Sequence, residues 1–159
     1  MYQVVIVDDE PFVLEDLKKS IDWEGSNFEI AYADTDPQHV LSYIHSHTVD
    51  LLITDINMPE MSGLTLITEA KAIQPLLSVL VLSAYDNFEY VRTALRNGAE
   101  NYLLKPLNPE ELLESIQSVA KHLKERNTLS NTYGSSIPQS VHRKLGERNT
   151  GQRRFSDPR

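Results

Sequence analysis

Side chains that could do chemistry directly follow several apolar runs of this 159-residue sequence. In chain order they are Asp8, Asp9 and Glu10 after VVIV, Asp55 after LLIT, Ser83 after the run SVLVL, and Lys105 after NYLL. Taken singly, an acid at such a point is more often a helix cap, a serine a turn residue and a lysine a solvated charge. Because all of them follow strand-like runs, they indicate a common site.

The combination of carboxylates with one hydroxyl and one amine predicts phosphoryl chemistry. Several carboxylates close together repel one another, and a cation relieves that repulsion. Mg²⁺ suits a site whose ligands are all oxygens. A carboxylate such as Asp55 can act as the nucleophile that forms an aspartyl phosphate, while the metal and Lys105 neutralise charge from two sides. We therefore interpret the set as a phosphoacceptor pocket in which Ser83 supplies a further hydrogen bond.

The elements that must position these residues alternate between strand-like and helix-like segments. Strands are predicted for Tyr2–Val7, Phe28–Ala33, Leu51–Thr54, Ser78–Leu82 and Asn101–Leu104. Helices are predicted for Pro11–Ile21, Asp36–His47, Leu64–Ile73 and Phe88–Arg96, with a last helix from the Asn108 cap to about Arg126. The pair Asn97-Gly98 predicts a left-handed helix end.

Alternating segments with short links favour parallel strands joined by right-handed crossovers. This pattern predicts a three-layer α/β sandwich with helices on both faces of the sheet. The predicted strands at 2–7, 51–54 and 78–82 are apolar along most of their length, as expected for strands covered on both faces. Ligands of such sheets bind beyond the carboxyl ends of the strands, which is where the chemical side chains lie.

Four motifs carry a specific resemblance, namely VVIVDDEP, LLITDINMPEMSG, VLSAYDNFEY and NYLLKPL. In this order and spacing they resemble the response-regulator receiver domain of two-component signalling, over roughly residues 1–126. The resemblance implies a flavodoxin-like, CheY-like (βα)5 fold with the strand order 2-1-3-4-5.

The same resemblance implies a role for each residue of the pocket. Asp55 would be phosphorylated by a sensor histidine kinase. Asp8 and Asp9 would be the acid pair that binds Mg²⁺, and the direct ligands would be Asp9, Asp55 and the backbone carbonyl of Asn57. The remaining implied roles are a switch hydroxyl at Ser83, a phosphate-binding amine at Lys105 before a cis bond to Pro106, and at Tyr102 an aromatic ring that reports the position of Ser83.

In receivers of this kind the signal leaves through the fourth helix, fifth strand and fifth helix. Here that surface would include Arg92, Arg96, Glu100 and residues near Glu111, as partners for a homodimer or an output domain. The alternative is that these are ordinary solvated helix charges. We expect no enzyme that turns over a metabolite, only Mg²⁺-dependent self-phosphorylation and self-dephosphorylation.

Two longer stretches, SIDWEGSNFEIA and SAYDNFEYVRTALRNGAENYLLKPL, resemble receivers that precede AraC-type helix-turn-helix domains. Such a protein would control transcription through a DNA-binding domain that has no room in this chain. Residues 127–159 have no sustained apolar periodicity, and we predict a disordered basic tail, a cut linker or sequence foreign to the domain. Residues 1–126 carry 9 Lys and Arg against 21 Asp and Glu, so the domain itself is not expected to bind nucleic acid.

Two other functions stay open from the sequence. The chain could be a stand-alone receiver that acts as a phosphorelay intermediate or a protein-binding switch. It could also be a Mg²⁺-dependent phosphohydrolase of the haloacid-dehalogenase type, but those enzymes resemble a DxD pattern after the first strand, whereas the nucleophile here follows the third. The absence of cysteine excludes disulfides and cysteine catalysis. The sequence shows neither a signal peptide nor an apolar stretch long enough to span a membrane. We therefore expect a cytoplasmic protein that does not contact membranes.

Overall fold

Strands and helices alternate along the chain in a computed structural model, which describes the backbone of residues 1–133 and the side chains of residues 1–127. The strands are β1 (Tyr2–Val7), β2 (Phe28–Asp34), β3 (Leu51–Thr54), β4 (Ser78–Ser83) and β5 (Ala99–Leu104). The helices are α1 (Pro11–Ser20), α2 (Pro37–Ser46), α3 (Gly63–Ile73), α4 (Phe88–Arg96) and α5 (Pro109–Tyr133), with a short 3₁₀ helix, η1 (Glu24–Ser26), before β2. Each predicted strand and helix is therefore present.

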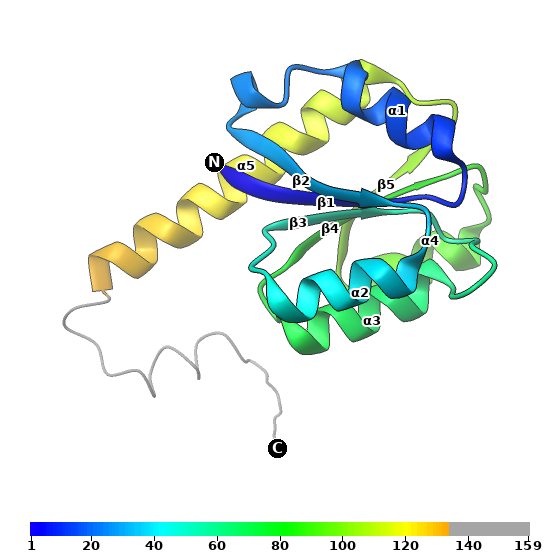
Figure 1. The fold of residues 1–159 in the computed structure, drawn as a ribbon. Coiled ribbons are helices and arrows are strands. Elements are labelled where there is room, and N and C mark those ends of the chain that lie inside the picture. The colour runs from blue at the N-terminus through cyan, green and yellow to red at the C-terminus, as the bar shows by residue number, and fades with distance from the viewer. Residues whose placement is uncertain (134–159) are drawn as a thin grey trace. The chain divides into compact units, whose positions relative to one another are not determined.

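The five strands form one parallel sheet in the order β2-β1-β3-β4-β5, which confirms the predicted fold and strand order. In Figure 1, α1 and the part of α5 up to Ala120 cover one face of this sheet, and α2 and α3 lie on the other. Because the strands are parallel, their carboxyl ends meet at one edge. The order also changes direction between β1 and β3, which is where α/β sheets bind ligands.

The core lies on both faces of the sheet within a compact unit, Met1–Ala120. Alternate strand residues such as Val5, Leu52 and Val79 pack with α2, α3 and α4 in one hydrophobic cluster. Their neighbours Val4, Leu51 and Leu80 are equally buried and point to the opposite face. Burial of each such side chain stabilises the fold by about 1.5–3 kcal/mol, so the central strands are rigid supports for whatever follows them.

Side-chain caps define where the helices begin. The Asp36 carboxylate accepts a hydrogen bond from the Gln38 N–H at 2.8 Å, and Pro37 occupies the first turn. The Asn108 side chain accepts from the N–H groups of Glu110 and Glu111 at 3.0 and 3.3 Å. These caps confirm the predicted starts of α2 and α5.

The end of α4 was also predicted from its sequence. Gly98 has φ = 107°, and its N–H donates to the Leu95 carbonyl. A left-handed glycine at this point closes the helix, as the Asn97-Gly98 pair predicted.

Two local features differ from expectation. The segment before β2 contains η1, which the sequence did not predict; the Trp23 indole N–H donates to the Leu17 carbonyl at 2.9 Å and so closes α1. Helix α5 extends to Tyr133, so the predicted end near Arg126 is too early. No glycine or proline occurs between Pro109 and Gly134 to stop the helix. The rest of the predicted tail, 134–159, lies outside the described residues, and the boundary at 126 stays a prediction.

Among the helices in the described part of the chain, none combines the length and the apolar character that crossing a bilayer requires.

Candidate functional site

Two aspartates follow adjacent strands at the carboxyl edge of the sheet. Val7 at the end of β1 pairs with Thr54 at the end of β3, so Asp8 and Asp55 leave the sheet side by side. Both are almost fully buried, with exposures of 2% and 5%. Asp9 is half-buried, and one carboxylate oxygen from each of the three residues lies within 4.8 Å of the others. The predicted acid cluster is therefore formed.

Lys105 brings a positive charge into this acid cluster from the end of β5. Its Nζ lies 2.8 Å from Oδ2 of Asp8 and 3.2 Å from Oδ2 of Asp55, and it also contacts Oε1 of Glu10 at 3.3 Å. The backbone fixes the approach, since the Lys105 N–H donates to the Ser83 carbonyl at 2.8 Å. The Lys105–Pro106 peptide bond is cis, as predicted.

The electrostatics of the pocket balance burial against charge pairing. Burial raises the pKa of Asp8, and hydrogen bonds from Lys105 and from the Glu10 N–H offset this only in part, so the pKa stays above its usual value. Burial lowers the pKa of Lys105, but the hydrogen bond and charge of Asp8 and the charge of Asp55 outweigh it and raise the pKa overall. The pocket thus holds a firmly charged ammonium beside an acid that resists ionisation.

The turn after β3 holds Asp55 in place. The Ile56 N–H donates to Oδ1 of Asp55 at 2.7 Å, and the Gly63 N–H donates to the Ile56 carbonyl at 2.7 Å. A Cβ added to Gly63 would lie 1.9 Å from the Asp55 carbonyl oxygen. Only glycine permits this close approach, so the segment MPEMSG returns to the strand end and fixes the backbone that carries Asp55.

Ser83 and Tyr102 are linked through the backbone of Tyr85. The Ser83 hydroxyl is buried and accepts a hydrogen bond from the Tyr85 N–H at 3.2 Å. The Tyr102 hydroxyl donates to the Tyr85 carbonyl at 2.6 Å. Burial raises the pKa of Tyr102, so its phenol keeps the proton that it donates. The hydroxyls of Ser83 and Tyr102 thus contact the N–H and the carbonyl of the same residue, which belong to two successive peptide units.

The residues present fit a small divalent cation. Asp8, Asp9 and Asp55 supply hard carboxylate oxygens close enough to share one ion. The raised pKa of Asp8 reflects a buried carboxylate whose charge Lys105 does not fully compensate. An additional cation would relieve this imbalance.

Most of the predicted site residues come together, and two further contributors had been given no role. Asp8, Asp9, Asp55 and Lys105 form one cluster, whereas Ser83 contacts Tyr85, and Asn57 is exposed. Sequence reasoning gave no role to Glu10, which contacts Lys105, or to Tyr85. Tyr85 contributes through its backbone, which no residue type reveals.

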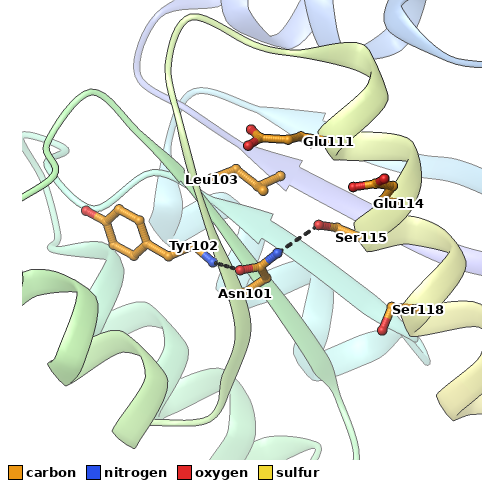
Figure 2. A pocket seen from close by; sticks show the side chains of 7 residues that line it. All are labelled: Asn101, Tyr102, Leu103, Glu111, Glu114, Ser115 and Ser118. Carbon is orange, nitrogen blue, oxygen red and sulfur yellow. Dashed lines mark hydrogen bonds between the residues drawn. The ribbon is translucent and has the colours of Figure 1, made fainter.

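A separate groove of about 260 Å³ lies between β5 and α5 (Figure 2). It is lined by Asn101, Tyr102, Leu103, Glu111, Glu114, Ser115 and Ser118. Asn101 joins its two walls, because its Nδ2 donates to the Ser115 hydroxyl at 3.0 Å. Figure 2 shows the Tyr102 ring pointing away from α5.

Comparison with known proteins agrees with this geometry. Residues 4–117 match the family model of the response regulator receiver domain. The transcriptional regulatory protein HptR of Staphylococcus aureus is 34% identical over 128 residues, which are 80% of this chain and 50% of that protein. The uncharacterized transcriptional regulatory protein YesN of Bacillus subtilis is 31% identical over 127 residues, 80% of this chain and 34% of that protein. The chain thus spans about half or less of the length of these relatives.

Solved structures give the same result. The receiver domain of AraT, a response regulator from Geobacillus stearothermophilus, matches with a TM-score of 0.75 and 36% identity, over 79% of this chain and 98% of that one. A CheY-like receiver domain protein from Methanospirillum hungatei matches with a TM-score of 0.72 and 27% identity, over 79% and 98%. The sequence-based expectation of a receiver is confirmed: the chain belongs to the response regulator receiver domain family.

Proposed function

We propose that Asp55 accepts a phosphoryl group from the phosphohistidine of a sensor histidine kinase. The observation that carries this proposal is the convergence of Lys105, 3.2 Å from Asp55, with Asp8 and Asp9 at the end of β3. The P–N bond of the donor breaks as a bond forms between phosphorus and an Asp55 oxygen, and the imidazole leaves. Lys105 holds its positive charge where the phosphoryl oxygens arrive, which lowers the cost of gathering negative charge.

We propose that this site binds Mg²⁺. Asp9, Asp55 and the Asn57 carbonyl would be its direct ligands, and Asp8 would complete the acid pair with Asp9. When bound, the ion supplies charge neutralisation for phosphoryl transfer. Two similar solved proteins support the proposal by their descriptions. One, from Burkholderia pseudomallei, has a phosphorylated aspartic acid and a calcium ion (TM-score 0.64, 25% identity), and the other is a CheX–CheY complex with BeF₃ and Mg²⁺ from Borrelia burgdorferi (0.68, 27%).

Phosphorylation then acts as a switch through Ser83. The new group adds close to two negative charges, so the Ser83 hydroxyl gains a stronger acceptor than it has now. When Ser83 turns to donate to the phosphoryl group, the Tyr85 N–H loses its present acceptor. Tyr102, which donates to the Tyr85 carbonyl in the next peptide unit, then changes position as the backbone around Tyr85 rearranges. This is the role we propose for the Ser83–Tyr102 pair.

We propose that α4, β5 and α5 carry the signal to a second copy of the chain or to an output domain. Helix α4 is suited to movement, because among its residues only Ala94 is buried, whereas α3 buries four. Three large apolar side chains of this region are exposed, namely Phe88, Leu95 and Leu104. The same elements carry charged residues, namely Arg92, Arg96, Glu100 and Glu111. Their charges would determine how the two surfaces align in the contact.

The output we propose is control of transcription through a DNA-binding domain outside this chain. Its support is that HptR and YesN, which extend well beyond the residues that match this chain, are described as transcriptional regulatory proteins. The receiver itself is acidic and is not proposed to contact DNA. Its own chemistry is limited to self-phosphorylation from small donors and slow self-dephosphorylation.

Intact-protein mass spectrometry after incubation with acetyl phosphate and Mg²⁺ tests the proposal. We expect one phosphoryl group on the wild type, none on Asp55→Asn, and none when the metal is chelated. Asp16→Asn is the matched control, because Asp16 is an exposed acid of α1 away from the pocket. A wild type that stays unmodified, or an Asp55→Asn variant that is modified as fully as the wild type, would contradict the proposal.

A further inference from the structure

Glu10 occupies a capping position without capping its helix. It precedes Pro11 at the start of α1, with the extended backbone of a helix cap (φ = −101°, ψ = 110°). A side chain at this position usually accepts a hydrogen bond from the first free N–H groups of the helix. The Glu10 carboxylate makes no such bond. Its Oε1 instead lies 3.3 Å from Nζ of Lys105, a residue 95 positions away in sequence.

The three anions around Lys105 differ in their freedom to move. The side chains of Asp8 and Asp55 are 3% and 7% exposed, so they cannot turn to water. The Glu10 side chain is 48% exposed. It can therefore leave Lys105 for solvent without stranding a buried charge.

The backbone of Glu10 also belongs to the pocket. Its N–H donates to Oδ1 of Asp8 at 2.9 Å, which fixes the start of α1 against the acid cluster. The carboxylate is thus carried by a rigid backbone at the open side of the site.

We propose that Glu10 is a positioning residue that acts through Lys105 and that the incoming phosphoryl group displaces it. This inference rests on the proposed phosphorylation of Asp55. Before phosphorylation, Glu10 holds the ammonium at the open side of the pocket. An arriving donor brings oxygens with about two negative charges, which repel Glu10 and compete for the same ammonium. Glu10 therefore raises the donor concentration that the reaction needs, without contacting the reacting atoms.

Two substitutions separate the contact from the charge. Glu10→Gln removes the charge, whereas Glu10→Asp keeps it on a side chain one methylene shorter. If Glu10 acts by holding Lys105, both variants reach half-maximal phosphorylation at a lower acetyl phosphate concentration than the wild type, with a similar maximal rate. The expected change is about threefold, the size that a partly exposed ion pair allows.

A readout without donor or metal keeps the test independent of phosphorylation. The NMR chemical shift of the Lys105 ammonium group should differ between Glu10→Gln and the wild type, because one of the three carboxylates that contact it is gone. Glu15→Gln is the matched control. Glu15 is an exposed acid of the same helix that pairs with Lys18 at 3.2 Å, so its loss should change neither measurement.

The outcomes distinguish the two proposals. A wild type that takes up no phosphoryl group contradicts the proposed function, while the Lys105 chemical shift still tests the contact with Glu10. A phosphorylated wild type with an unchanged donor dependence in Glu10→Gln overturns the inference. So does a Glu10→Asp variant that behaves like the wild type, since charge alone would then explain the effect.

Discussion

Two charged clusters near the carboxyl edge of the sheet have similar composition and opposite character. The pocket consists of Asp8 and Asp55 around Lys105, whose side chain is 13% exposed. The surface cluster consists of Asp34, at the end of β2, and Asp36 around His39, whose ring is 63% exposed. In the surface cluster Nδ1 of His39 lies 3.0 Å from Asp34 and Nε2 lies 3.5 Å from Asp36. Both clusters surround one cation with carboxylates.

The pKa values of Asp8 in the pocket and Asp34 in the surface cluster are shifted in opposite directions. Burial raises the pKa of Asp8 above its usual value despite Lys105. Burial also raises the pKa of Asp34, but hydrogen bonds from Tyr32, the Asp36 N–H and His39 outweigh it and leave the pKa lowered. In the surface cluster, the negative charge of Asp34 is therefore compensated by the groups that contact it. The pocket keeps a surplus of buried negative charge, which is the state expected of a site that awaits a cation and a phosphoryl group.

The rigidity of the pocket backbone predicts the largest effect. Gly63→Ala should lower the free energy of unfolding by about 3 kcal/mol or more, because its Cβ would overlap the Asp55 carbonyl oxygen and force the backbone apart. Phosphorylation from acetyl phosphate should fall with it. Urea unfolding and intact-mass measurements check both.

Gly25 offers the matched control. An added Cβ at Gly25 meets only the side chain of Asp22, which can rotate away. Gly25→Ala should therefore cost much less stability and leave phosphorylation intact. An equal loss in the two variants would mean that the close approach at Gly63 is not what fixes Asp55.

The buried charge surplus predicts a stabilising substitution. The folded pKa of Asp8 is raised, so its contribution to stability is present below the unfolded value of 3.8 and is lost as pH rises through the folded value. At neutral pH the ionised Asp8 therefore costs stability. Asp8→Asn should raise the free energy of unfolding by about 1 kcal/mol at pH 7, with little gain near pH 3.8, while weakening Mg²⁺ binding. Thermal unfolding across pH and calorimetric metal titration measure the two effects; a variant less stable at pH 7 would contradict the argument.

Periodicity was enough to predict the α/β sandwich and the convergence of most site residues, whereas the strand order and the residue roles came from the resemblance to receiver domains. Parallel strands bring their carboxyl ends to one edge, so residues that follow apolar runs, such as Asp8, Asp55 and Lys105, must converge. The helix starts at Asp36 and Asn108 could also be predicted, because capping depends on residue types that lie next to each other in sequence.

The features that were missed depend on contacts between distant residues or on backbone atoms. Glu10 looks like one more acid after a strand until Lys105 is placed beside it. Tyr85 acts through its backbone N–H and carbonyl. Trp23 closes α1 through a hydrogen bond from its indole N–H to the carbonyl of Leu17. Helix α5 continued because nothing in its sequence stops it, whereas the prediction ended it where the apolar pattern fades.

The surface cluster predicts the smallest effect. The hydrogen bond to Asp34, with the charges of Asp36 and Asp34, raises the pKa of His39 above 6.5, so its contribution to stability is present below 6.5 and is lost as pH rises through the folded value. The lowered pKa of Asp34 contributes stability above 3.8 that is lost as pH falls through its folded value. The two contributions to stability are therefore both present between pH 3.8 and pH 6.5.

Asp34→Asn should therefore destabilise the protein most between about pH 4 and 6.5. It should change stability less than Asp8→Asn does, with the opposite sign. It should also bring the NMR titration of His39 back toward its usual range and that of Tyr32 down from about 12. If Asp34→Asn stabilised the protein as Asp8→Asn does, the two clusters would have the same charge imbalance. Burial would then not explain why the pocket carries uncompensated negative charge and the surface cluster does not.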